Sequence, residues 1–371
     1  MPIISSPQDF NVEDLYVDLR PVLGCPLYLK CEGFNFAGSV KLKAAAQMVD
    51  AAERDGSLTP DSILVESSSG NLGVALSIIA AARGHRFVCV TDPRCNPATM
   101  RLMRALGAEV RVVSRPDAAG GYLASRIAYV RELCASDRRY LWLNQYANPN
   151  NWLAHYRGTA PAIDRGFPGL EVLFVGAGTT GTLMGCARYF RERGRPVTIV
   201  AVDAVGSVTF GGVPGRRLVP GLGTSCRPAL VDESYIDDVV HVPEADTIRT
   251  VHRLSAHGFM FGGSTGTVVS GAERWLAAKY PGADPVAVAI APDLGERYLD
   301  SLYEEHWLRR HFPDLVPELF PGAEPDLQEP AEEPCAAPVG APADAPGGEA
   351  ARELTAVTDL TDLTDPHRSR P

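Results

Sequence analysis

The segment from Gly33 to Ala46, GFNFAGSVKLKAAA, joins a glycine-containing loop to a stretch with helical spacing of apolar residues. We expect Ser39 to cap a helix over Val40–Arg54, which an Asp-Gly pair ends. Lys41 then lies in the first helical turn, where the backbone dipoles are positive and disfavour an ammonium group. Partial burial lowers the pKa of such a lysine further and makes a neutral amine available as a nucleophile or base. The alternative is an ordinary helical lysine that reaches solvent.

The composition is that of a globular α/β protein with an unusual C-terminal end. The chain has 371 residues, of which 45% are hydrophobic, enough for one large domain or two smaller ones. The net charge is −10, and residues 322–371 hold eleven acidic and three basic residues, so the rest is nearly neutral. A nearly neutral body argues against nucleic acid or a membrane as partner. Residues 321–371 are rich in proline, alanine and acidic residues, and we expect a disordered tail that chemistry does not need.

The cysteines and histidines give no sign of a metal site. Eight cysteines lie far apart without a CxxC pair, and no signal peptide precedes them, which favours a reducing cytoplasm. The eight histidines form no ligand signature, and His306 and His311 fit the polar face of a closing helix over Glu296–His311. No apolar run reaches the length of a membrane span. We therefore predict a cytoplasmic protein without a bound metal.

Short apolar runs alternate with helical patterns along most of the chain. Strands are expected near residues 26–32, 63–65, 86–91, 109–113, 171–175, 197–203, 239–242 and 286–291. Strands that alternate with helices at this spacing predict an α/β fold with two doubly wound, mainly parallel sheets. Ligands of such sheets bind at the carboxyl ends of the strands.

Three junctions between a predicted strand and a helix are rich in small residues, so each can present backbone N–H groups to an anion. The first, Ser67–Gly73 (SSSGNLG), is suited to a carboxylate. The second, Gly176–Thr182 (GAGTTGT), has the pattern of a phosphate cradle, and the third, Gly262–Gly266 (GGSTG), offers hydroxyl groups. Simple helix capping is the alternative for the first and the third.

The second junction has a competing interpretation. It matches GxGxxG, and Asp203 ends the next predicted strand, where a dinucleotide enzyme places its ribose-binding acid. A nucleotide-linked dehydrogenase is therefore one alternative. Taken together, however, an activated lysine, a carboxylate-sized nest, a phosphate-sized nest and a hydroxyl-bearing turn are the groups that pyridoxal 5′-phosphate requires.

Seven sequence blocks resemble the cysteine synthase/cystathionine beta-synthase family of fold-type II pyridoxal-phosphate enzymes, in that family's order and spacing, across residues 5–310. These blocks are FAGSVKLKAA, SSSGNLGVAL, NQYANPNN, GAGTTGTLMG, LVPGLG, GGSTG and PDLGERYL. The resemblance implies a tryptophan-synthase-beta-like fold with the active site between two sheets. It also implies a large cofactor-binding domain over residues 1–34 and 151–320, a smaller mobile substrate-binding domain over 35–150, and a homodimer.

The resemblance assigns roles to individual residues. Lys41 forms an imine with the cofactor and later moves the substrate Cα proton, while Asn71 bonds to the ring hydroxyl. Ser264 meets the pyridine nitrogen, and a neutral hydroxyl there leaves the nitrogen unprotonated, which favours β-elimination to an aminoacrylate. The implied phosphate ligands are Gly178, Thr179, Thr180, Gly181 and Thr182. The implied ligands of the substrate carboxylate are Ser68, Ser69, Gly70 and Gln145.

Four positions depart from the usual sulfhydrylase pattern, namely Leu72, Tyr146, Thr180 and Arg126. The added hydroxyl groups and guanidinium make the site smaller and suit a dianionic leaving group such as phosphate. In these departures the chain resembles the N-(2-amino-2-carboxyethyl)-L-glutamate synthases, the 2,3-diaminopropionate branch that serves siderophore and peptide-antibiotic pathways. Such transferases eliminate phosphate from O-phospho-L-serine and add the amine of L-glutamate. The alternative for Arg126 is a solvated helix arginine.

Two further functions stay open at this point. A cysteine synthase that uses sulfide with O-acetylserine or O-phosphoserine is the nearest alternative enzyme, and phosphate release with glutamate or with sulfide separates the two. A non-catalytic binding protein would need Lys41 to be absent or blocked, and Lys41 is present.

Overall fold

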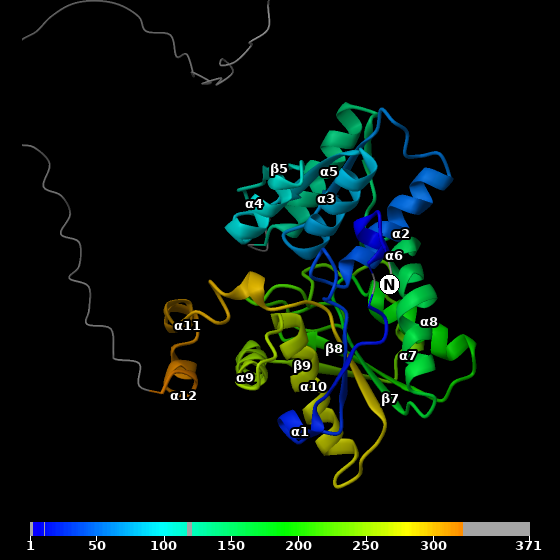
Figure 1. Ribbon diagram of the computed structural model, residues 1–371. Coiled ribbons are helices and arrows are strands. Elements are labelled where there is room, and N and C mark those ends of the chain that lie inside the picture. Colours follow the sequence, from blue (N-terminus) through cyan, green and yellow to red (C-terminus); the bar gives the residue numbers. More distant parts are fainter. Residues whose placement is uncertain (1–2, 11, 117–120, 322–371) are drawn as a thin grey trace, which may run out of the picture. The chain divides into compact units, whose positions relative to one another are not determined.

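Two β-sheets form the framework of the computed structural model, which describes residues 3–10, 12–116 and 121–321 (Figure 1). The six-stranded sheet has the order β1 (Tyr16–Asp18), β2 (Tyr28–Cys31), β10 (Ala287–Ala291), β7 (Val172–Gly176), β8 (Thr198–Ala204) and β9 (Asp238–Val242). The four-stranded sheet has the order β5 (Glu109–Val112), β4 (Arg86–Thr91), β3 (Ile63–Ser67) and β6 (Tyr140–Trp142). All neighbouring strands are parallel except β1 and β2.

Helices follow the strands, and in Figure 1 α3, α4 and α5 gather around the four-stranded sheet. The α-helices are α1 (Arg20–Leu23), α2 (Lys41–Arg54), α3 (Asn71–Arg83), α4 (Pro97–Ala105), α5 (Leu123–Ser136), α6 (Pro149–Ala154), α7 (Ala160–Gly166), α8 (Gly181–Glu192), α9 (Glu244–Ser255), α10 (Gly263–Lys279), α11 (Glu305–His311) and α12 (Val316–Leu319). One π-helical turn, η2 (His155–Thr159), joins α6 to α7. Short 3-10 turns are η1 (Pro7–Asp9), η3 (Glu233–Tyr235), η4 (Glu296–Tyr298) and η5 (Pro313–Leu315).

The central strands are apolar on both sides, as a parallel sheet covered by helices requires. Every residue of β10 is buried, and so is every residue of β3. Along β7 the side chains alternate: Phe174 packs with Trp275 of α10, whereas Leu173 and Val175 pack in the cluster that contains α8. Each face of the six-stranded sheet therefore has its own core, and the predicted fold class is confirmed.

The start of α2 corrects one prediction. Ser39 is not the cap: α2 begins at Lys41 after Val40, and the buried Ser39 hydroxyl has no hydrogen-bond partner among the described residues. Instead, Ser39 pairs through its backbone with Asp293, and the Val40 N–H donates to the Pro292 carbonyl at 2.7 Å. A contact with a segment 250 residues away thus fixes the helix start. Local capping patterns carry no information on such a contact.

The closing helix is a second correction. Only the 3-10 turn Glu296–Tyr298 and the later helix α11, Glu305–His311, are helical in the range predicted as one element. The Glu304 carboxylate caps α11 by accepting from the His306 N–H at 2.9 Å, which makes it a separate helix. The short antiparallel strand β1 and helix α1 were not predicted.

Several other expectations concern the described residues or lie beyond them. Within the described ranges, no helix is long and apolar enough to cross a membrane, and no three His, Cys, Asp or Glu side chains group as a metal site. The seven cysteines there are free thiols, and Cys335 lies outside those ranges. The predicted disordered tail also lies outside them. The boundaries of the two predicted domains stay a prediction, with which the separate sheets are consistent.

Candidate active site

Lys41 is the first residue of α2 and lies beside the carboxyl end of β10. Burial lowers the pKa of its ammonium group, and the nearby Asp293 carboxylate opposes this effect. Because desolvation is the larger of the two influences, the neutral amine is favoured relative to a lysine in water. The direction of the predicted pKa shift is therefore confirmed.

Asp293 forms the centre of a polar cluster around this lysine. It is 1% exposed, and its Oδ2 accepts from Asn71 Nδ2 at 2.9 Å and from the Tyr298 hydroxyl. Arg297 Nη1 donates to Asn71 Oδ1 at 2.7 Å, so the Asn71 amide is held from both ends. Asp293 Oδ1 is buried and has no partner in the described part of the chain.

The glycine loop between β7 and α8 is closely packed. A Cβ on Gly178 would lie 2.9 Å from the Gly221 carbonyl oxygen, and one on Gly181 would lie 2.5 Å from Asn151 Cγ. Thr180 has φ +66°, a left-handed conformation that strains a β-branched residue. Its buried hydroxyl makes no hydrogen bond within the described residues. The loop thus combines glycines that the packing demands with a strained threonine whose hydroxyl is free.

Most of the third junction, Gly262–Gly266, belongs to a helix and not to a loop before it. Ser264 lies in the first turn of α10, which begins at Gly263. Gly221, from the LVPGLG block, has φ +111°, and any side chain there would collide with Ser264 Oγ. Since Gly221 also contacts the Gly178 position, the second and third junctions lie side by side.

Asn151 connects the first junction to the second. Its Nδ2 donates to the Gln145 carbonyl at 2.7 Å and to Thr179 Oγ1 at 3.0 Å. Gln145 Nε2 in turn donates to the Ser67 carbonyl at 2.9 Å. The Ser68 hydroxyl accepts from the Gly73 N–H at 2.9 Å, so Ser68 also serves as a local cap. The structure therefore brings the three predicted junctions and Lys41 together.

Two buried charged groups lie behind the first junction. Glu66 accepts from Trp142 Nε1 at 3.0 Å and from the backbone of Gln145 at 3.1 Å, yet burial raises its pKa to about 7. Arg126 is 7% exposed; its Nε lies 3.3 Å from Asp92 Oδ2, but neither Nε nor Nη1 has a hydrogen-bond partner among the residues described. The alternative of a solvated helix arginine is therefore wrong.

Two other residues of the predicted set differ in their surroundings. Tyr146 is partly buried, and burial raises the pKa of its phenol to about 12, against the opposing charge of Arg126. Leu72 packs in the apolar core of the four-stranded sheet. Leu72 is thus a core residue.

Several polar residues of the site were not predicted. They are Lys43, Asn151, His155, Asp293 and Arg297; all but His155 lie within a quoted sequence block, and His155 follows one by four residues. Asn151 and His155 are four residues apart, as are Asp293 and Arg297, a spacing that places both members of a pair on one face of a helix or turn. This spacing was the available signal.

The unpartnered groups describe what the site can hold. Buried polar atoms without partners in the described chain include Ser67 Oγ, Thr180 Oγ1, Asp293 Oδ1 and Arg126 Nη1. Buried polar groups are normally satisfied, and the hydroxyl groups of Ser67 and Thr180 and the Arg126 guanidinium can donate to a polar, anionic ligand. An amine, hydroxyl donors and a glycine-lined cradle fit a phosphorylated aldehyde.

Comparisons with known proteins agree with this chemistry. The family model described as "Pyridoxal-phosphate dependent enzyme" matches residues 16–293. An N-(2-amino-2-carboxyethyl)-L-glutamate synthase of Ralstonia nicotianae is 41% identical over 76% of this chain and 84% of its own length. The protein of the same description from Cupriavidus metallidurans is 40% identical over 79% of this chain and 88% of its own. The crystal structure of an O-ureido-L-serine synthase matches with a TM-score of 0.74 and 32% identity, over 81% of this chain and 96% of that one.

Proposed function

Because the chain belongs to the family of pyridoxal-phosphate dependent enzymes, we propose that it replaces the phosphate of O-phospho-L-serine with the amine of L-glutamate. The product is N-(2-amino-2-carboxyethyl)-L-glutamate, a precursor of 2,3-diaminopropionate for a siderophore or a peptide antibiotic. The cofactor is pyridoxal 5′-phosphate, which when bound supplies the electron sink for loss of a leaving group from the β-carbon. The enzyme is thus a β-replacement transferase, and we propose that it works as a homodimer in the cytoplasm.

The residues around Lys41 hold the cofactor in this proposal. Lys41 attaches it and moves the substrate Cα proton, a task for which burial prepares the amine by lowering its pKa. The Asn71 amide bonds to the ring hydroxyl, and Ser264 meets the ring nitrogen. The phosphate ligands are Gly178, Thr179, Thr180, Gly181 and Thr182.

The substrate occupies the first junction. Its carboxylate binds to Ser68, Ser69, Gly70 and Gln145, next to the fixed Asn71 amide. Arg126, Tyr146 and Thr180 act on the leaving phosphate. The observation that carries the choice of a phosphorylated donor is the buried Arg126 guanidinium, which lies 3.3 Å from Asp92 through Nε and leaves Nη1 without a partner among the described residues. Unpaired buried donors bind a dianion more strongly than a neutral ester.

A sulfide-using cysteine synthase is the second candidate. A solved O-acetylserine dependent cystathionine beta-synthase from Helicobacter pylori has a TM-score of 0.74 and 27% identity, over 81% of this chain and 99% of that one. Relatives with other donors and nucleophiles therefore share this fold.

One experiment separates the two candidates. The purified full chain is mixed with O-phospho-L-serine and either L-glutamate or sulfide, and the product mass and released phosphate are measured. We expect the mass of N-(2-amino-2-carboxyethyl)-L-glutamate, with no turnover by Lys41→Ala because the amine is lost. Cysteine as the preferred product supports the second candidate, and turnover by Lys41→Ala contradicts both.

A further inference from the structure

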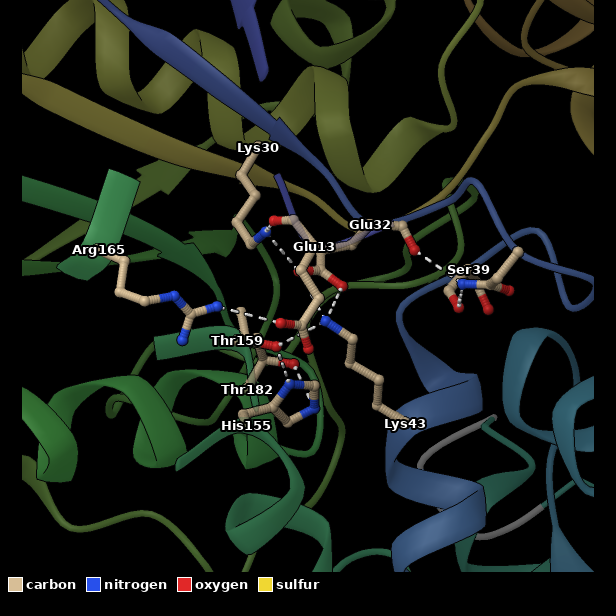
Figure 2. A network of polar contacts seen from close by, with 10 residues as sticks. Glu13, Lys30, Glu32, Ser39, Lys43, His155, Thr159, Arg165 and Thr182 are labelled. Atoms are coloured by element: carbon tan, nitrogen blue, oxygen red, sulfur yellow. Dashed lines mark hydrogen bonds and ion pairs between the residues drawn. The ribbon is translucent and has the colours of Figure 1, made fainter. Parts of the chain in front are cut away.

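A buried chain of polar side chains leads from the six-stranded sheet to the phosphate loop (Figure 2). Glu32, at the end of β2, binds Lys30 at 3.3 Å and Lys43 at 2.8 Å, and neither the Lys30 nor the Glu32 side chain reaches solvent appreciably. Lys43 Nζ also donates to Thr159 Oγ1 at 3.5 Å, the longest link of the chain. The proposed function gives no role to these residues.

His155 continues the chain toward the phosphate loop. Its Nδ1 lies 3.1 Å from Thr159 Oγ1 and its Nε2 lies 3.2 Å from Thr182 Oγ1, and the imidazole is fully buried. Figure 2 shows the ring between the two threonines, with Lys43 approaching from α2. Both ring nitrogens are therefore engaged, one on the side of Lys43 and one on the side of the loop.

The local backbone is arranged to bring His155 to this position. His155 and Thr159 are the two ends of the π-helical turn η2, and such turns inside α-helices occur frequently at functional sites. On α8, a Cβ at Gly185 would lie 2.6 Å from His155 Cβ, so only glycine lets α8 approach so closely. Gly185 follows Thr182 by one helical turn and thereby sets the distance between its hydroxyl and the imidazole.

The donor and acceptor capacities give the chain a direction. A lysine ammonium can only donate, so the Thr159 oxygen accepts from Lys43, and its O–H is available to donate to His155 Nδ1. Burial and the charges of Lys43 and Lys41 hold the pKa of His155 well below its usual value, so the ring is neutral. A neutral ring that accepts at Nδ1 carries its proton on Nε2 and donates it to Thr182. The Thr182 O–H is then left to point away from the ring.

We propose that Lys43, Thr159 and His155 form a one-way hydrogen-bond relay that holds the Thr182 hydroxyl as a donor to the cofactor phosphate. All three are positioning residues, because they act through Thr182 and do not touch the reacting atoms. The relay rests on the phosphate role of the Gly178–Thr182 loop in the proposed function. Linked hydrogen bonds polarise one another, so the charge of the partly buried Lys43 strengthens the last donor in the series.

The test compares two forms of the aldehyde on the full chain freed of cofactor. Pyridoxal 5′-phosphate and pyridoxal share the ring and the aldehyde and differ only in the phosphate group. We expect Thr159→Val to weaken the binding of pyridoxal 5′-phosphate about tenfold, because one charge-assisted hydrogen bond is lost. Pyridoxal affinity stays unchanged. Thr159→Ser, which keeps the hydroxyl, retains the wild-type affinity for both aldehydes.

The controls separate this inference from a structural effect and from the function itself. Thr250→Val also removes a buried hydroxyl, one that bonds within α9, and is expected to change neither affinity. Equal losses for both aldehydes in Thr159→Val, or no loss, overturn the relay. If Thr182→Val weakens the phosphorylated aldehyde while Thr159→Val does not, only the relay fails. If neither variant does, the phosphate role of the loop fails as well. If the Thr159→Val protein does not fold, Thr159→Ala is used in its place.

Discussion

The two loops that we propose to bind anions, the substrate loop (Ser67–Gly73) and the phosphate loop (Gly176–Thr182), have the same plan but different support. Both follow a buried parallel strand and open a helix, β3 to α3 in one case and β7 to α8 in the other. In the phosphate loop, Asn151 holds Thr179 and His155 holds Thr182, and the glycines pack against other segments. The substrate loop is capped by its own Ser68 hydroxyl.

The ionisable side chains behind the two loops also differ, in how far their hydrogen-bonding capacity is used. Glu66 and Arg126, behind the substrate loop, are a carboxyl group that titrates near neutrality and a guanidinium with unused donors. The neutral His155 behind the phosphate loop has partners at both nitrogens. This difference fits our proposal that the phosphate loop holds a cofactor that stays bound, whereas the substrate loop binds ligands that exchange.

The largest expected effect concerns Glu66, whose pKa is raised to about 7 from 4.5 by burial. The folded chain keeps a proton that the unfolded chain releases, so this stabilisation is complete below pH 4.5 and is lost as pH rises through 7. The shift corresponds to about 3 kcal/mol. Glu66→Gln should remove that part of the pH dependence, measured by urea unfolding between pH 5 and pH 8.

The pH dependence of stability that His155 contributes has the opposite sign to that of Glu66, so it is a check on the comparison. Its pKa is depressed, so its contribution to stability is present above pH 6.5 and is lost as pH falls. An unchanged difference between pH 5 and pH 8 in Glu66→Gln would mean that the carboxyl group titrates normally and that the two loops are alike in this respect.

The next effect concerns Arg126. A charge-assisted pair between its guanidinium and a phosphate contributes about 1.5 to 3 kcal/mol, so Arg126→Ala should lower kcat/KM for O-phospho-L-serine roughly ten- to a hundredfold. An uncharged donor such as O-acetyl-L-serine should lose much less. The comparison of the two donors is the measurement. Equal losses would instead indicate that Arg126 supports the substrate loop through Asp92 and not through the leaving group.

The sequence contains enough information for the parallel strands, the three loops and Lys41, because each is a local pattern of glycines, hydroxyl residues and apolar periodicity, but not for the antiparallel β1. It fails where a contact joins distant segments. Ser39 loses its predicted capping role to a backbone pairing with Asp293. The pairing of Lys43 with Thr159 spans 116 residues. The burial of Arg126 depends on how α5 packs, which its helical pattern alone does not reveal.

A smaller effect tests how tightly the phosphate loop is built. Gly181→Ala places a methyl group 2.5 Å from Asn151 Cγ, and overpacking of this kind costs about 1 to 3 kcal/mol. We expect a lower melting temperature and weaker binding of pyridoxal 5′-phosphate. Gly169→Ala is the matched control, because no atom lies within 4 Å of its added methyl group. Equal melting temperatures for the two variants would show that Asn151 can move, which would remove the distinction between a fixed and an adaptable loop.

The smallest effect is expected at Thr180, a residue of the phosphate loop to which the proposed function also gives a role toward the leaving phosphate of the substrate. Its left-handed backbone, with φ +66°, costs a β-branched residue about 1 to 2 kcal/mol, and its hydroxyl has no partner within the described chain to offset this. Thr180→Gly relieves the strain but gives the unfolded chain more freedom, so a net gain of up to about 1 kcal/mol in unfolding free energy is expected. The same change keeps the backbone N–H of residue 180 for the cofactor phosphate but removes a hydroxyl donor to the leaving phosphate, so kcat/KM for O-phospho-L-serine should fall while the cofactor stays bound. Thermal unfolding and donor kinetics on one preparation measure both quantities. A stabilised variant with a weaker preference for the phosphorylated donor would show that the backbone strain at Thr180 is retained because its hydroxyl contributes to substrate choice. A destabilised variant would show instead that the hydroxyl contributes to the fold, and the phosphate loop would then owe its conformation to Thr180 itself.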